Sequence, residues 1–124
     1  MLIHEYLELN AQKNPEKIAL IFENHRKTYR DIDEDANRIA RFLVQAGVKK
    51  GDRVSIFLEN SIEAVVSIYA VLKAGGVFLP LSATLKTKKL EYILNNSEST
   101  ILITETSKSK VVSEAVHNNT HLTD

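Results

Sequence analysis

Two histidines near the end of the chain have the spacing of metal ligands. His117 and His121 stand four residues apart, as ligands on one helix face do, and Glu114 falls on the same face as a third candidate. Because this segment is polar and typical of a frayed terminus, we interpret these side chains as solvated. His4 and His25 are isolated. The chain has no cysteine, which excludes disulfide scaffolds, thiolate zinc sites and cysteine nucleophiles.

Carboxylates and hydroxyls are the next candidates, for acid–base and nucleophilic chemistry. The segment 31–35 carries four acids, which could act as a carboxylate pair. It stands at the predicted start of a helix, where acids complement the positive end of the helix dipole, so a structural role is favoured. Ser55, Ser61 and Ser67 lack a Gly-x-Ser-x-Gly setting and have no histidine near them in sequence. No catalytic residue is predicted.

A lysine-rich stretch is the third candidate. Lys73, Lys86, Lys88 and Lys89 fall in a part of the chain without acids, which a phosphate, a coenzyme or another domain could recognise. No aromatic residues are interleaved with these lysines, so we interpret them as a solvated loop and helix face. The four glycines match neither G-x-G-x-x-G nor G-x-x-x-x-G-K-[ST]. The sequence therefore predicts no cofactor-binding or metal-binding residue either.

Charge and hydropathy limit the partners of the chain. The 16 basic and 16 acidic side chains cancel, which argues against binding of nucleic acid or an anionic membrane. The first residues lack a basic leader followed by an apolar run. The longest apolar stretch, 64–72, contains Ser67 and is far shorter than a membrane span. We therefore expect a cytoplasmic protein.

The elements that must position these residues follow an alternating order. Apolar strands are predicted at 53–58, 77–81 and 100–104, with a helix between each pair. This βαβαβ pattern predicts an α/β fold: a three-layer arrangement with a parallel sheet, right-handed crossovers and helices on both faces. The length of 124 residues allows one domain and little more. The parts expected within residues 1–124 are a helix and hairpin extension over about 1–30, a core over about 31–117 and a loose tail at 118–124.

Local signals give the expected boundaries of the elements. In the extension, a helix at 2–13 with Ile3, Tyr6 and Leu7 on one stripe precedes a hairpin that turns at a left-handed Asn24. After a first core helix that ends at Gly47, the expected helices of the core are 61–74, 87–96 and 108–117. The helix 61–74 is apolar on most of its circumference, so it should be covered on more than one side.

Residue types at the helix ends complete the prediction. Thr28 and Asp31 have the spacing of a capping box, and the helix that they begin should end at Gly47. Thr87 is expected to cap the helix 87–96. Gly75 and Gly76 should form the turn that leads into the strand 77–81.

The amino-acid sequences of several segments resemble those of the adenylate-forming ligases, which include acyl-CoA synthetases, peptide-synthetase adenylation domains and luciferases. Residues 27–32 resemble the first core motif of the family, with Asp31 for the usual Glu and Ile32 for the usual Leu. Residues 47–54 look like the turn into the first central strand, and 72–81 closely resemble the second core motif. After this motif the family usually has Asp or Asn and then Pro, where this chain has Ser82 and Ala83.

The resemblance continues through residues 59–63, 90–97 and 101–104, and it covers roughly residues 2–106. It implies the opening part of a large N-terminal domain, with the phosphate loop, the magnesium glutamate and the catalytic lysine lying downstream. ATP, magnesium and coenzyme A or phosphopantetheine are thus implied for the full-length family and for no residue of this chain, which should be inactive alone. The turn at 83–87 looks slightly more like the acyl-CoA synthetase version than the peptide-synthetase version.

Two alternatives to an acyl-CoA synthetase remain open. One is the amino-acid-activating adenylation domain of a peptide synthetase. The other is a non-catalytic module that binds a partner or itself. The expected partners are the remainder of a ligase and, through apolar faces such as the helix 61–74 and an open sheet edge, a second copy of the chain.

Overall fold

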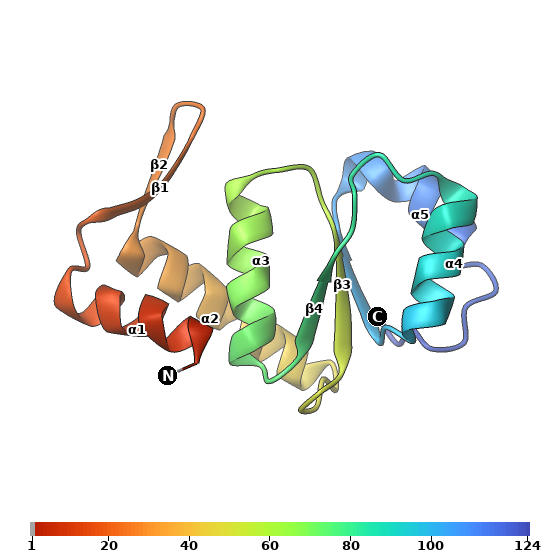
Figure 1. Cartoon of the computed structure of the whole chain (residues 1–124), viewed down its shortest axis with the longest axis horizontal. Coiled ribbons are helices and arrows are strands. Elements are labelled where there is room, and N and C mark those ends of the chain that lie inside the picture. Colours follow the sequence, from red (N-terminus) through yellow and green to blue (C-terminus); the bar gives the residue numbers. More distant parts are fainter. Residues whose placement is uncertain (1) are drawn as a thin grey trace.

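A three-stranded parallel sheet forms the middle layer of the computed structural model, which describes residues 2–124 (Figure 1). β3 (Arg53–Phe57) lies in the centre, between β4 (Val77–Pro80) and β5 (Ile101–Thr104). Val54 pairs with Phe78 on one side and with Ile101 on the other. The predicted strands are thereby confirmed to within one residue at each end, and so is their parallel pairing.

Helices cover both faces of this sheet, as predicted (Figure 1). One face is covered by α2 (Tyr29–Gln45) and α3 (Ile62–Lys73), and α1 (Ile3–Lys13) packs on these two helices away from the sheet. The other is covered by α4 (Thr87–Ser97) and α5 (Ser109–Ala115), the latter preceded by the 3-10 helix η1 (Thr106–Lys108). Among residues 2–124, no helix has the length and apolar character that crossing a bilayer demands.

The alternation of β3 explains why the core has two parts. Successive side chains of a strand point to opposite faces. Val54 and Ile56 therefore pack in the cluster under α2 and α3, whereas Phe57 packs with Leu90 and Leu94 under α4 and α5. A strand that is buried on both faces must be apolar along most of its length, which is the pattern that 53–58 displays.

The hairpin of β1 (Ile18–Phe22) and β2 (His25–Thr28) projects beyond the helices (Figure 1). Its turn corrects the prediction at Asn24, because the left-handed residue is Glu23, with φ of 55°. In two-residue hairpin turns that match the twist of the strands, the first turn position takes positive φ. Glu23 occupies that position. The position in the turn, and not the tolerance of Asn for a left-handed conformation, therefore determines which residue adopts it.

Two helices differ in detail from the prediction. Thr87 does not cap α4: it is the first helical residue, and its hydroxyl donates to Oε2 of Glu114 at 3.1 Å. The helix also continues past 96 to Ser97 and ends at Glu98, with φ of 55°. In α1, the expected apolar stripe is only partly buried, since Leu7 is buried while Ile3 and Tyr6 are exposed.

The expected loose tail instead lies along the outer edge of β5. The Thr123 amide donates to the Thr100 carbonyl at 2.8 Å, and the Leu102 amide donates to the Asp124 carbonyl at 3.2 Å. The side-chain oxygen of Asn119 accepts from the amides of His121 and Leu122. The polar side chains of this tail therefore satisfy backbone groups, a role that composition alone does not reveal.

The capping box at the start of α2 is confirmed. The Asp31 amide donates to the Thr28 hydroxyl, and the Thr28 amide donates to the Asp31 carboxylate, each at 3.1 Å. The hydrogen bond from the Thr28 amide is the main cause that lowers the pKa of Asp31 below its usual 3.8. A carboxylate with a lowered pKa stabilises the fold above that usual value, and the contribution is lost as pH falls through the folded-state pKa.

Asp31→Ala is therefore expected to lower the free energy of unfolding by about 0.5–1 kcal/mol at pH 7. The difference from the unsubstituted chain should shrink steadily as the pH is lowered below 4. Urea unfolding followed by circular dichroism, at pH 7 and at a pH below 4, measures this difference in the free energy of unfolding. Glu34→Ala is the control, because this exposed acid lies one turn further along α2 and makes no cap. An equal loss at both pH values would contradict the role of the carboxylate.

Candidate functional site

The carboxyl edge of the sheet is the part of this fold where a ligand site is expected. Three loops meet there: residues 58–61 after β3, 81–86 after β4 and 105–108 after β5. In open α/β sheets, ligands bind outside the carboxyl ends of the strands, where the connections diverge to opposite faces. Here α3 leaves β3 on one face, whereas α4 follows β4 and η1–α5 follow β5 on the other, so the connections diverge on both sides of β3.

Lys108 joins all three loops at this edge. Its Nζ donates to Oε1 of Glu59 and to the carbonyl of Ala83, each at 3.0 Å, and lies 4.9 Å from the centroid of the Phe57 ring. The side chain is 11% exposed. A nearly buried ammonium needs partners, and these contacts provide a carboxylate, a carbonyl and an aromatic face. Lys108 therefore neutralises Glu59 and fixes the loops relative to one another.

An apolar groove of about 360 Å³ opens beside these loops. Leu20 and Phe22 of β1, Leu58, Val65 and Pro80 are among the side chains that line it. The polar side chains in its lining belong to residues 60 and 61. The hydroxyl of Ser61 is already engaged as the cap of α3, accepting from the Ala64 amide at 3.1 Å. The groove thus suits an apolar group and presents no activated nucleophile.

Lys73 does not belong to the lysine stretch that the sequence suggested. Its Nζ forms ion pairs with Oδ1 of Asp33 at 2.7 Å and with Oε1 of Glu8 at 2.9 Å, and its side chain is 5% exposed. Burial by itself lowers the pKa of Lys73, but the two carboxylates outweigh it and raise the pKa above its usual value. The residue joins α1, α2 and α3, and only Lys86, Lys88 and Lys89 remain exposed on the far side of the sheet.

Three of the four acids in the segment 31–35 make structural contacts. Asp31 caps α2, Asp33 pairs with Lys73, and Asp35 pairs with Arg38. These contacts leave the segment 31–35 without the facing pair of carboxylates that acid–base chemistry uses.

The serines and histidines are likewise apart from one another. Ser55 is buried and shares a hydrogen bond of 2.6 Å with Ser99, and Ser67 is buried in α3. His117 and His121 are exposed. Within residues 2–124, no three His, Cys, Asp or Glu side chains gather as a metal site would require.

Sequence reasoning misses Lys108 and the partners of Lys73. The sequence places Lys108 only at the start of a predicted helix, and Glu59 stands 49 positions before it. Glu8 stands 65 positions before Lys73. No local pattern connects residues at such separations, and only the crossovers bring them together.

Comparisons with known proteins agree on one family. The model of the family described as AMP-binding enzyme matches residues 7–123. Tyrocidine synthase 1 of Brevibacillus parabrevis is 38% identical over 110 residues, which is 89% of this chain and 10% of that protein. Bacitracin synthase 1 of Bacillus licheniformis is 37% identical over 102 residues, which is 82% of this chain and 2% of that protein.

A solved structure shows the same architecture. The coronafacic acid ligase from Pectobacterium brasiliense superposes with a TM-score of 0.91 at 30% identity, over 98% of this chain and 24% of that one. The chain thus spans a tenth or less of the two synthases and about a quarter of the ligase. The family model and the relatives match almost the whole of residues 2–124, and the chain belongs to the AMP-binding enzyme family.

Proposed function

We propose that this chain is the N-terminal part of the large domain of an adenylate-forming ligase. The full-length enzyme would activate a carboxylic acid with ATP to an acyl-adenylate and then transfer the acyl group to a thiol. The observation that carries the proposal is the family match over residues 7–123, together with the short share of each relative that the chain spans. In this proposal the chain supplies a rigid αβα unit against which the catalytic segments assemble.

The acids of this chain do not fit a magnesium site at the carboxyl edge. Glu59 and Glu105 lie 3.0 Å and 4.0 Å from Nζ of Lys108, so a cation already occupies the space between them. Magnesium and ATP are therefore assigned to residues outside this chain, and no chemical step is assigned to a side chain within it. The coenzyme A or phosphopantetheine thiol is assigned in the same way.

Pyrophosphate–ATP exchange tests the proposal. The purified chain of 124 residues is expected to show no exchange that depends on a carboxylic acid. The chain joined to the segment that follows it in its gene is expected to show exchange with its proper acid. That following segment should encode a Ser/Thr/Gly-rich phosphate loop with a lysine within roughly a hundred codons. Exchange by the 124 residues alone, or a downstream segment without such a loop, would overturn the assignment.

The acyl substrate and the thiol acceptor define two versions of this ligase. The turn at 83–87 and the similarity to the coronafacic acid ligase favour an acyl-CoA synthetase type. The higher identity to the two synthases favours an amino-acid-activating adenylation domain. Hydroxamate formation by the full-length enzyme separates them, with proteinogenic amino acids in one panel and fatty and aromatic acids in the other. Acylation of coenzyme A by the activated product supports the first version.

Exposed apolar side chains suggest where the remainder of the ligase packs. The expected surface, α3, is largely covered by α2 and the sheet. Exposed apolar residues lie instead on α1 and β1, where Tyr6, Ile21 and Phe22 are examples, and others lie on α2, β4 and α4. Without the remainder, the chain is proposed to self-associate through these residues. Light scattering of the purified chain at millimolar concentration should show dimers or larger species, and a clean monomer would contradict this.

A further inference from the structure

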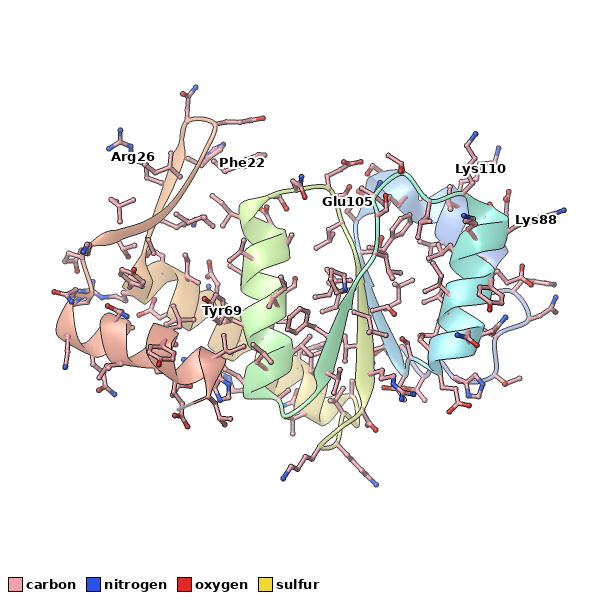
Figure 2. All side chains as sticks on the ribbon, in the orientation of Figure 1. Phe22, Arg26, Tyr69, Lys88, Glu105 and Lys110 are labelled. Carbon is pink, nitrogen blue, oxygen red and sulfur yellow. The ribbon has the colours of Figure 1, made fainter. Side chains whose placement is uncertain are left out.

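Four lysines gather where α4 and α5 begin. Lys86, Lys88, Lys89 and Lys110 are all exposed, and none of the ion pairs within residues 2–124 includes them. Figure 2 shows Lys88 and Lys110 at the same end of the molecule, with their side chains pointing away from it. We call this group, together with the outward face of α4 next to it, the α4 lysine surface.

The backbone beneath this surface is held in one arrangement. The hydroxyl of Thr87, next to Lys88, donates to Glu114 of α5 at 3.1 Å. Lys108, just before α5, donates to the carbonyl of Ala83, just before α4, at 3.0 Å. The like charges of the lysines are therefore kept near one another by contacts that they do not make themselves. Holding unpaired like charges together is unfavourable in the isolated chain, and a partner of opposite charge would relieve it.

The outward face of α4 continues the surface away from the lysines. Tyr92 is 68% exposed, one helical turn after Lys88, and it borders an open groove of about 570 Å³. The other side chains in its lining are Glu91, Asn95 and Asn96. Tyrosine is enriched in protein–protein interfaces, where it supplies contact area and a hydroxyl. Two acids, Glu91 and Glu114, lie near the surface, compared with its four lysines.

We propose that the α4 lysine surface docks an acidic face of a partner protein, in addition to the role proposed above for the chain. Lysines provide point charges that steer an acidic surface into place, and Tyr92 provides the contact that orients it. Nucleic acid is less suited, because the surface has no arginine and a single aromatic side chain, and the net charge of the chain is zero. The carboxylates of the partner are expected to lie over α4 and the start of α5.

Fluorescence anisotropy with a labelled Glu-rich helical peptide tests the proposal at low ionic strength. The 124-residue chain should bind the peptide, and Lys88→Glu/Lys110→Glu should weaken binding by about tenfold or more. The matched control is Lys49→Glu/Lys50→Glu, which makes the same charge change on exposed lysines in the turn before β3. Tyr92→Ala should weaken binding several-fold at unchanged net charge.

Each remaining outcome decides against the proposal. Equal loss in the two double variants would show a response to net charge alone. Unchanged affinity in Lys88→Glu/Lys110→Glu or in Tyr92→Ala would exclude the α4 lysine surface as the binding face. Tighter binding to a labelled oligothymidylate, or to vesicles that contain phosphatidylserine, would replace the acidic protein by nucleic acid or membrane. Circular dichroism of every variant must match that of the unsubstituted chain, as expected for exposed positions.

Discussion

Replacing Phe57 by alanine is expected to lower the free energy of unfolding by about 3–5 kcal/mol. Phe57 is 1% exposed and fills the space between the sheet and α4 and α5, against Leu90 and Leu94. Its loss leaves a cavity in the smaller of the two apolar clusters, and it also removes the ring beneath the Lys108 ammonium. Domains of this kind have about 5–15 kcal/mol of stability in total, so the change should remove a large share of it.

Urea unfolding followed by far-ultraviolet circular dichroism measures this effect, since the chain has no tryptophan. Phe42→Ala is the matched control, because Phe42 is 55% exposed on α2 and should change stability by no more than about 0.5 kcal/mol. Comparable losses in the two variants would mean that the cluster under α4 and α5 does not exist as described. Lys108→Met should keep part of the stability that Lys108 contributes, because the long apolar side chain of Met still covers the Phe57 ring.

The second large effect is expected at Lys73. Lys73→Met should lower the free energy of unfolding by about 2–3 kcal/mol, because Asp33 would be left partly buried without its cation. Glu8 is more exposed than Asp33, so Glu8→Gln should cost less than about 1 kcal/mol. The double variant Lys73→Met/Asp33→Asn should be more stable than the sum of the single losses predicts. Additive losses would contradict a direct ion pair.

The pH dependence of this ion pair has a definite sign. The pKa of Lys73 is raised in the folded chain, so its contribution is complete below the unfolded-state value and is lost as pH rises through the folded-state pKa. Stability of the unsubstituted chain should therefore fall on the alkaline side, above about pH 10. Lys73→Met should lack this part of the decline. An identical alkaline profile in the two proteins would assign the decline to other groups.

The order of elements was predictable because each strand and helix carries its own local signal. The apolar character of 53–58, and the spacing of Thr28 and Asp31, depend on neighbouring residues only, and the structure confirms both the strand and the capping box. The left-handed residues were not predictable in the same way. Glu23 and Glu98 take this conformation because of their positions in a tight turn and after a helix, although their residue type does not favour it.

The contacts at the candidate site could not be read from the sequence. Lys108 and Glu59 meet because β3 and β5 are adjacent and parallel, and no residue near either position indicates the pairing. The grouping of Lys73 with Lys86, Lys88 and Lys89 failed for the same physical reason, since closeness along the chain does not imply the same face of the sheet. The prediction that this chain holds no catalytic residue stays a prediction.

The central place of β3 has a consequence for folding during synthesis. Most of the cluster under α2 and α3 is complete once β4, which ends at Pro80, has left the ribosome, whereas Thr104, which bonds to Phe57, follows Pro80 by 24 residues (104 − 80). At typical translation rates that interval is roughly 1–5 s. During it, one face of β3 is packed and the other presents Phe57 without α4 and α5. The nascent chain is therefore most exposed to chaperones and to aggregation after β4 is made and before α4 and α5 are in place.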